Sequence, residues 1–586
     1  MSQRHEYKVV RERNVMVPMR DGVRLATDVY RPDSSGRFPV LVTRGPYGKD
    51  TYADNQEHSI WYFPPRGYVV VSQDCRARFK SEGDYYDPLF QESQDGYDTI
   101  EWAARQPWSN GRVATTGQSY LGAAQYTLAA ANPLPPHLRT MVPVSASSDF
   151  HQSWVYHTGG AMEWGWTVPY AIHKGRNTLE RAGRDDLLAQ LDEYVLKPYN
   201  FARPLRDSWY RHLPMRDWID RLKETAPYLS EYFDQEKDGP YWWRINFLRQ
   251  VQHIDLPMFH ISSWYDIFQE GALNSYQAMR KSAPTPEARS GQKLLVGPWA
   301  HLLPYTVPNT GGTGDIDFGA DARIQLHEHL LRWYDYWLKD VQTGIMEEPP
   351  VSIFVMGENR WRAEDEWPLA RTHYTRYYFH AESPANTRHG SGMLSTAPPG
   401  DEPPDSYVYE PDNPVPTNGG STLIIPQGVE DQRDVEDRQD VLVYTSEPLE
   451  LDLEITGPIS VRLFASTTAA DTDFTAKLVD VRPDGYAQNL QDGIIRGRYR
   501  TSAAEPSFLE QGKVYEFEID LWSTSHVIKA GHQLRVEVSS SNFPRFDRNP
   551  NTGAPIGRDS LLEPARQTVY HSSDYASHII LPVIPR

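Results

Sequence analysis

In the first 150 residues, short continuous apolar runs alternate with a segment of helical periodicity. Apolar runs occupy residues 38–43, 68–74 and 140–145, whereas residues 94–106 space their apolar side chains as a helix does. Continuous runs are typical of parallel strands that are buried on both faces. Strands that alternate with helices predict right-handed crossovers and a doubly wound α/β sheet. Before them, residues 15–30 predict a hairpin around the turn Arg20-Asp21-Gly22.

The alternation is interrupted between residues 150 and 249 by helix-like segments rich in tryptophan. An insertion between two halves of an α/β sheet is typically a lid over the end of the sheet that carries the site. The strand pattern resumes at residues 257–262 and 293–297, and residues 322–341 predict an amphipathic closing helix. We therefore expect an α/β core in two halves, residues 1–149 and 250–347, with a helical cap at 150–249.

From residue 348 to residue 586 the pattern is all-β. Short alternating runs are separated by clusters of glycine, proline and aspartate, and they lie at residues 351–355, 374–379, 459–465, 514–520 and 533–538. This spacing predicts a two-sheet sandwich of the jelly-roll type. The acidic stretch 430–440 alternates its charges with Arg433 and Arg438, which favours a solvated loop over a metal site.

Composition excludes several classes of partner. The 586 residues contain 59 Lys and Arg against 78 Asp and Glu, a net charge of −19, which disfavours nucleic acid and anionic membranes. Cys75 is the single cysteine, so no intrachain disulfide can form. The N-terminal residues lack an apolar signal region, and no run approaches the roughly 20 apolar residues of a membrane span. We expect a cytoplasmic protein.

The pattern of residues 112–124 predicts a strand, a tight turn and a helix, with Ser119 at the turn. A serine there projects from the end of the sheet and lies at a helix N-terminus, where backbone N–H groups favour developing negative charge. The usual motif is G-x-S-x-G, whereas here Leu121 takes the place of the second glycine and Gly122 follows it. Two interpretations remain open, a nucleophile and an ordinary helix N-cap serine.

A serine nucleophile needs a histidine base and a carboxylate that orients it. The two strands after the cap run into Asp266 and His301, in the order expected of an α/β-hydrolase fold. Other histidines fit less well. His260 lies inside an apolar run, as a core histidine does, while His327 and His329 lie in the closing helix without the i, i+4 spacing of a zinc motif.

Five ordered motifs together carry a resemblance to a known family: Arg44-Gly45-Pro46-Tyr47-Gly48, residues 73–83, Gly117-Gln118-Ser119-Tyr120-Leu121-Gly122, Trp264-Tyr265-Asp266 and Gly297-Pro298-Trp299-Ala300-His301. They resemble the cocaine-esterase-like (CocE/NonD) hydrolases, which are related to X-Pro dipeptidyl peptidases and α-amino acid ester hydrolases. Residues 431–433, 440–442 and 471–474 look like the C-terminal jelly-roll motifs of that family. The resemblance covers essentially the whole chain.

The resemblance implies an α/β-hydrolase fold in which Ser119 is the nucleophile, His301 the base and Asp266 its orienting acid. It also implies an oxyanion hole formed by the Tyr47 hydroxyl and the Tyr120 backbone N–H, without a metal or organic cofactor. Two positions depart from the family. Ala77 follows Arg76 where glycine is usual, so that loop is expected to differ, and Leu121 replaces the acidic residue common in amino acid ester hydrolases.

For the substrate we expect a small-molecule carboxylic ester with a bulky apolar or aromatic part. Aromatic residues of the cap and of the strand ends are candidates for its pocket: Trp154, Trp164, Trp166 and Phe268. An amide or an X-Pro-type peptide bond is the alternative, because fold and triad serve all three. A non-catalytic glycan-binding protein is a remote alternative, and a homodimer is compatible with the sandwich. Cys75 is expected to be a small core residue.

Overall fold

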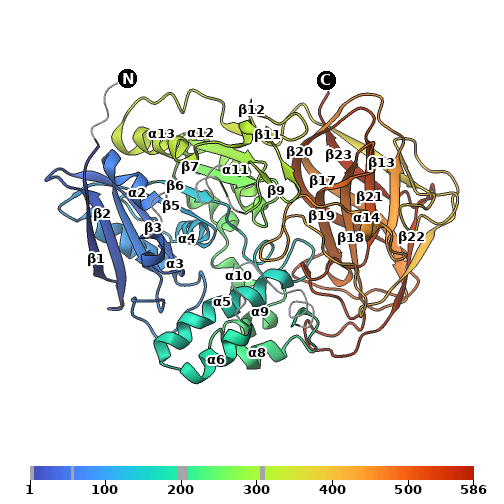
Figure 1. Cartoon of the computed structure of the whole chain (residues 1–586), viewed down its shortest axis with the longest axis horizontal. Coiled ribbons are helices and arrows are strands. Elements are labelled where there is room, and N and C mark those ends of the chain that lie inside the picture. The colour runs from blue at the N-terminus through green and yellow to red at the C-terminus, as the bar shows by residue number, and fades with distance from the viewer. Residues whose placement is uncertain (1–5, 54–58, 195–208, 302, 304–310, 586) are drawn as a thin grey trace.

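The computed structural model describes residues 6–53, 59–194, 209–301, 303 and 311–585. An α/β unit, a helical cap and a β-sandwich are arranged side by side, with the cap beneath the other two (Figure 1). The fold class predicted from the sequence, an α/β hydrolase with a cap and a C-terminal jelly roll, is confirmed.

The central sheet has ten strands in the order β1-β2-β4-β3-β5-β6-β7-β8-β11-β12. The predicted hairpin forms its first two strands, and strands β3 to β8 together with β11 pair in parallel. Their bounds are β1 Val9–Pro18, β2 Arg24–Pro32, β3 Phe38–Gly45, β4 Val69–Asp74, β5 Ser109–Gln118, β6 Leu138–Val144, β7 Met258–Ser263, β8 Gln292–Gly297, β11 Val351–Val355 and β12 Arg360–Glu364.

Helices cover both faces of this sheet, as the continuous apolar runs predict. Successive residues of β4 point to opposite sides: Val69 and Val71 pack in one core cluster with helices α3 Glu92–Ala104 and α4 Tyr120–Ala129, and Val70 packs in another with α13 Leu326–Lys339. Helices α11 Gln269–Ser282 and α12 Pro286–Ser290 follow β7. The closing helix begins at Leu326, later than predicted, because residues 320–322 form a separate 3₁₀ turn.

One strand lies in a different sheet from the one predicted. Val351–Val355 was expected in the sandwich, but as β11 it pairs in parallel with β8 and extends the α/β sheet beyond residue 348. Val351 and Ile353 pack with Leu294 and Val296. The prediction that this strand belongs to the sandwich is therefore wrong. It failed because a short apolar run identifies a strand but not the strand with which it pairs.

The cap contains helices α5 Trp164–Ala182, α6 Asp185–Tyr194, α8 Asp217–Leu222, α9 Leu229–Asp234 and α10 Pro240–Trp243. Hydrogen bonds connect the cap to both the α/β unit and the sandwich. Asn177 of α5 accepts a hydrogen bond from the backbone N–H of Phe79 at 2.8 Å, in the loop after β4. At the other side, the Gly165 N–H donates to the Arg545 carbonyl at 3.0 Å. The cap thus connects the α/β unit to the sandwich.

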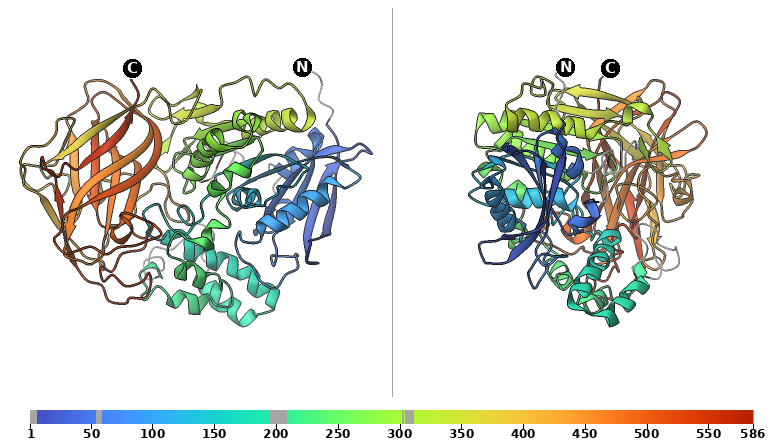
Figure 2. Two further views of the ribbon diagram at one scale, coloured as in Figure 1. Left: turned by 180° about the vertical axis from the view of Figure 1, so that it is seen from behind. Right: turned by 60° about the vertical axis from the view of Figure 1, so that its left-hand side comes forward.

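The C-terminal domain is a β-sandwich (Figure 2). Its largest core cluster includes Phe379, Val461, Phe517 and Val536. Its strands are β13 His373–His380, β14 Met393–Ser395, β15 Asp405–Tyr409, β16 Leu442–Ser446, β17 Leu453–Thr467, β18 Asp473–Val481, β19 Ala487–Arg496, β20 Tyr515–Ile528, β21 Gln533–Ser539, β22 Ala565–Tyr570 and β23 His578–Val583. In the acidic stretch, Asp431 pairs with Arg433 and Asp440 with Arg438.

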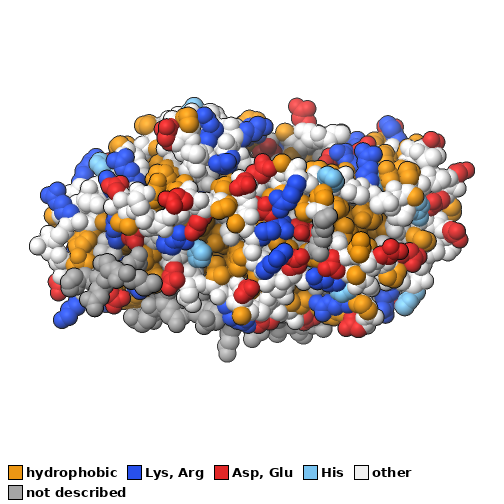
Figure 3. Space-filling model, turned by 90° about the horizontal axis from the view of Figure 1, so that it is seen from above, with side chains coloured by type: hydrophobic (Ala, Val, Ile, Leu, Met, Phe, Trp, Pro, Cys, Tyr) orange, Lys and Arg blue, Asp and Glu red, His pale blue; other side chains and the backbone are white. Residues whose placement is uncertain are grey.

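Acidic and basic side chains are interspersed over the face drawn in Figure 3. No helix among the described residues is long and apolar enough to cross a membrane.

Candidate active site

Ser119 lies between the end of β5 and the start of α4 with φ 61° and ψ −126°. A left-handed conformation in a non-glycine residue costs about 1–2 kcal/mol and persists only where the surroundings enforce it. Here the Ser119 N–H donates to the Val144 carbonyl of β6 at 2.9 Å. The side chain is partly exposed and makes no capping hydrogen bond to α4. The N-cap interpretation is therefore wrong, and the nucleophile stays a prediction.

The spacing of the glycines around Ser119 follows from close packing at the turn. A Cβ on Gly117 would lie 2.4 Å from the Leu121 Cβ, and one on Gly122 would lie 2.7 Å from the Ala146 Cβ and 2.9 Å from the Val144 oxygen. The Leu121 side chain also reaches Gly45 at the end of β3, where an added Cβ would lie 2.7 Å from its Cδ1. Leucine fits at position 121 because Gly117 and Gly45 face it. The close packing that normally requires the second glycine of G-x-S-x-G is found here at Gly122.

Asp266 follows β7 and His301 follows β8, and their side chains are hydrogen-bonded to each other. His301 Nδ1 lies 2.9 Å from Asp266 Oδ1, and both side chains are buried. The Phe268 backbone N–H donates to the same carboxylate oxygen at 2.9 Å. An acceptor held in this way favours the tautomer that carries its proton on Nδ1, which leaves Nε2 able to accept a proton.

Gln118 connects the serine turn to the histidine loop. Its Nε2 donates a short hydrogen bond to the His301 backbone carbonyl. The neighbouring carbonyl, of Ala300, accepts from Ser263 Oγ at 2.8 Å. The backbone of the histidine loop is therefore tied to the end of β5 and to the end of β7, the strands that lead to Ser119 and Asp266.

Tyr47 and Tyr120, the two expected oxyanion donors, lie side by side. Their rings meet edge to face with centroids 6.4 Å apart, and Tyr47 is partly exposed. The Tyr120 N–H is in the first turn of α4, where intrahelical hydrogen bonding does not use it. Its phenol is buried, accepts from the Leu89 N–H at 2.9 Å and donates to Glu92 Oε1 at 3.0 Å.

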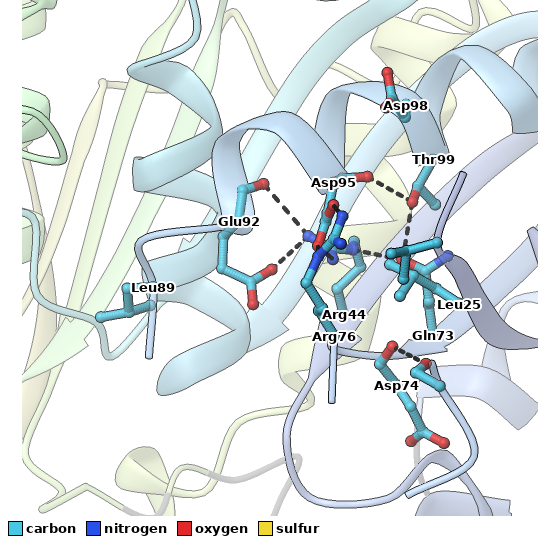
Figure 4. Close-up of polar contacts among 12 residues, drawn as sticks. Leu25, Arg44, Gln73, Asp74, Arg76, Leu89, Glu92, Asp95, Asp98 and Thr99 are labelled. Carbon is cyan, nitrogen blue, oxygen red and sulfur yellow. Dashed lines mark hydrogen bonds and ion pairs between the residues drawn. The ribbon is translucent and has the colours of Figure 1, made fainter. Parts of the chain in front are cut away.

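A buried ionic network supports the loop that carries Tyr47 (Figure 4). Arg44, three residues before Tyr47, forms a short ion pair with Glu92 and donates from Nε to Gln73 Oε1 at 2.6 Å. Asp95 lies 3.8 Å from the same guanidinium. Glu92 thus bonds both Arg44 and Tyr120. Sequence reasoning missed this network, and the only signal for it was an arginine at the end of an apolar strand.

The loop after β4 keeps the backbone that glycine would favour. Ala77 has φ 56°, so alanine occupies a left-handed position where the family usually has glycine. Cys75 is buried, as expected, and burial, followed by the charge of Glu92, raises the pKa of its thiol. Burial also raises the pKa of Asp74 to about 6.

Three of the four predicted pocket aromatics lie together beside the histidine. Trp154 stacks on Phe268 with centroids 5.0 Å apart and an angle of 8°, and Trp166 meets both rings edge to face. Phe268 in turn meets the His301 ring at 5.4 Å. Trp164 does not join this aromatic cluster of Trp154, Trp166 and Phe268. Its Nε1 donates to the Tyr210 carbonyl at 3.1 Å inside the cap.

Two of the other candidate histidines, His260 and His327, have structural partners. His260 is buried between Tyr126 and Gln292, and burial lowers its pKa to about 4. His327 lies 3.0 Å from Ser59 Oγ and stacks on Tyr62. Within the described residues, no group of three or more His, Cys, Asp or Glu side chains is arranged to hold a metal ion.

Comparison with known proteins identifies the family of this chain. The chain is 38% identical to the cocaine esterase of Rhodococcus sp. (strain MB1 Bresler), over 98% of each sequence. It belongs to the cocaine-esterase-like family of serine hydrolases. Residues 21–303 match the S15 family described as X-Pro dipeptidyl-peptidase, and residues 343–580 match the C-terminal non-catalytic domain of that peptidase.

Two solved structures share the whole architecture of this cocaine-esterase-like chain. An aminopeptidase from a marine sediment archaeon, Thaumarchaeota archaeon, superposes with a TM-score of 0.84 at 27% identity, covering 100% of this chain and 97% of that one. An α-amino acid ester hydrolase superposes with a TM-score of 0.81, also at 27% identity, covering 100% and 98%. Esterases and aminopeptidases thus occur on the same scaffold.

The packing at the serine turn generates a stability prediction. We expect Gly122→Ala to lower the free energy of unfolding by about 1–3 kcal/mol, because the added methyl overlaps Ala146 and the Val144 carbonyl. Gly400→Ala is the control, since an added Cβ there has no atom within 4 Å. Thermal unfolding of both variants measures the difference, and equal midpoints would contradict the packing argument.

The bond from Gln118 generates a prediction about activity. Gln118→Met keeps the length of the side chain but removes the donor to the His301 carbonyl. We expect kcat to fall about tenfold while stability falls by no more than the roughly 1 kcal/mol of one hydrogen bond. The matched control is Gln106→Met, which removes a similar bond to the Trp102 carbonyl at the end of α3. A wild-type kcat in Gln118→Met would show that this bond does not position His301.

Proposed function

We propose that the protein hydrolyses carboxylic esters through an acyl-enzyme intermediate on Ser119. The observation that carries this proposal is the buried Asp266–His301 hydrogen bond, whose histidine backbone is bonded by Gln118, the residue before the strained Ser119. Acyl transfer by a serine hydrolase requires a nucleophilic serine and a histidine oriented to accept its proton, and in α/β-hydrolase folds the serine lies on a strained turn at a strand end.

In the first half-reaction, Ser119 Oγ attacks the ester carbonyl while His301 Nε2 removes the hydroxyl proton. The tetrahedral intermediate collapses when the C–O bond to the alcohol breaks, and His301 returns the proton to the leaving oxygen. Water then attacks the acyl-Ser119 ester with His301 again as the base, which releases the acid and restores the serine. Asp266 holds the imidazole and stabilises its cationic form.

The negative charge of each tetrahedral intermediate needs donors that are already in place. We assign this role to the Tyr47 hydroxyl and the Tyr120 N–H, which lie on two adjoining elements, the loop after β3 and the first turn of α4. Removal of one such donor costs about 10²–10³ in rate. The Arg44–Glu92 pair supports both, because Glu92 also accepts from the Tyr120 phenol.

The surroundings of the site favour an uncharged acyl group. The aromatic cluster of Trp154, Trp166 and Phe268 adjoins His301 and would contact an apolar or aromatic part of the substrate. A peptidase that takes a free N-terminus must bind an α-ammonium. Here the side-chain amine of Lys174 lies 3.6 Å from the Tyr47 ring centroid, where a second cation would be repelled. The similarity to an archaeal aminopeptidase keeps amide or peptide hydrolysis as the alternative.

Matched substrates separate the two activities. We expect turnover of aryl esters of benzoic and short aliphatic acids, and turnover of the matching anilides at least 10³-fold lower. Ser119→Ala should reduce ester turnover by about 10⁴-fold or more. Ser290→Ala, at an exposed serine in α12, is the control.

The outcomes discriminate between specific claims. Equal turnover of esters and anilides would favour the amidase, and preference for substrates with a free α-amino group would favour the peptidase. Ester turnover retained in Ser119→Ala would contradict the proposed nucleophile itself.

A further inference from the structure

Helix α5 of the cap places a buried lysine over the ring of Tyr47. Lys174 is 2% exposed, and its Nζ lies 3.6 Å from the centroid of the Tyr47 ring and 5.4 Å from that of Tyr170. An ammonium at such a distance is attracted to the ring face. The position is notable because the hydroxyl on this ring is the proposed oxyanion donor.

Lys174 has no counter-ion among the described residues, where no carboxylate oxygen lies within 4.0 Å of its Nζ. A buried guanidinium, that of Arg78, lies close to it. Arg78 is 1% exposed, donates to Thr178 Oγ1 at 3.1 Å and to the Lys174 carbonyl at 3.0 Å, and its Nε has no hydrogen-bond partner. Buried cations are normally paired, because an unpaired one loses its hydration without compensation.

The reaction itself supplies the missing negative charge. An ester is neutral, and so are the Tyr47 phenol and the Tyr120 amide. When Ser119 attacks, one negative charge develops on the carbonyl oxygen that these donors bind. A fixed charge that is unpaired before this step and paired during it lowers the energy of the transition state relative to the bound ester.

We propose that Lys174 is an electrostatic positioning residue of the oxyanion hole, whose ammonium, held over the Tyr47 ring, strengthens the Tyr47 hydroxyl as a donor to the tetrahedral oxyanion. This inference rests on the proposed function of Tyr47. Lys174 acts through Tyr47 and is not assigned a contact with the substrate.

The groups that face Lys174 set its response to pH. They are Arg78 and Cys75 from the loop after β4, His173 and Tyr170 from α5, and Tyr47. Burial, followed by the charge of Arg78, lowers the pKa of Lys174 well below 10.5. The ammonium is present below that pKa and lost above it, so kcat should decline with rising pH at values where an ordinary lysine stays protonated.

The experiment is a double-mutant cycle on ester turnover with Lys174→Met and Tyr47→Phe. Methionine keeps the apolar stem and removes the charge, and phenylalanine keeps the ring and removes the donor. We expect Lys174→Met to lower kcat about tenfold at nearly constant KM, to abolish the alkaline decline, and to leave the thermal midpoint equal or higher. Lys174→Arg should restore part of kcat.

In the Tyr47→Phe background we expect Lys174→Met to change kcat less than twofold. The matched control is Lys293→Met, which removes another buried amine. That amine donates to the Glu348 and Pro349 carbonyls at 3.0 Å each, away from the site. This control should lose stability and keep kcat.

Each negative result overturns a different assignment. If Tyr47→Phe leaves kcat unchanged, the assignment of Tyr47 as an oxyanion donor fails and this inference fails with it. If Tyr47→Phe is slow but Lys174→Met has wild-type kcat and pH profile, only the role of Lys174 is overturned. An equal loss on Lys174→Met in both backgrounds would overturn its action through Tyr47.

Discussion

The structure depends on close packing at one turn, the turn between β5 and α4. Between Gly117 and Gly122 the chain reverses from β5 into α4 with Ser119 in a left-handed conformation, and Cβ atoms on these two glycines would overlap Leu121, Ala146 and the Val144 carbonyl. The β3 and β6 strands beside β5 close the turn from both sides. This packing maintains the strain at Ser119.

The charges around this turn are arranged in two distinct ways. The Arg44–Glu92 ion pair is internally matched and lies at the start of the loop that carries Tyr47. Lys174 has no such match among the described residues. Paired buried charges give precise positions, whereas an unpaired one raises the energy of the free enzyme and is compensated only when an opposite charge forms. The cap therefore contributes more than a cover, because α5 brings Lys174 and Trp166 to the α/β unit.

Much of this arrangement could be predicted from sequence, for a physical reason. Ser119, Asp266 and His301 each follow a parallel strand, and the carboxyl ends of such strands meet at one edge of a sheet. The local sequence pattern was therefore enough to predict that Asp266 and His301 lie close together, and they are hydrogen-bonded in the structure. Whether they act as proposed on Ser119 stays a prediction, as does the oxyanion role of Tyr47 and Tyr120.

Other features depend on contacts between distant segments, which no local pattern contains. Strand β11 was assigned to the sandwich because its apolar run fits either sheet. Trp164 and Trp166 are two residues apart on α5, yet one points into the cap and the other toward Phe268. The tolerance of Leu121 depends on Gly45, and the roles of Arg44 and Lys174 depend on residues 30 or more positions away.

In the proposed mechanism this turn presents a nucleophile and an oxyanion donor to one carbonyl carbon, and Tyr47 supplies the second donor. The most direct measurement is a crystal structure of the enzyme after reaction with an aryl phosphonate, whose phosphorus mimics the tetrahedral intermediate. We expect a covalent bond from phosphorus to Ser119 Oγ, with one phosphoryl oxygen about 2.7–3.1 Å from both the Tyr47 hydroxyl and the Tyr120 N–H. A phosphonate bonded to another residue, or an oxygen turned away from both donors, would contradict it.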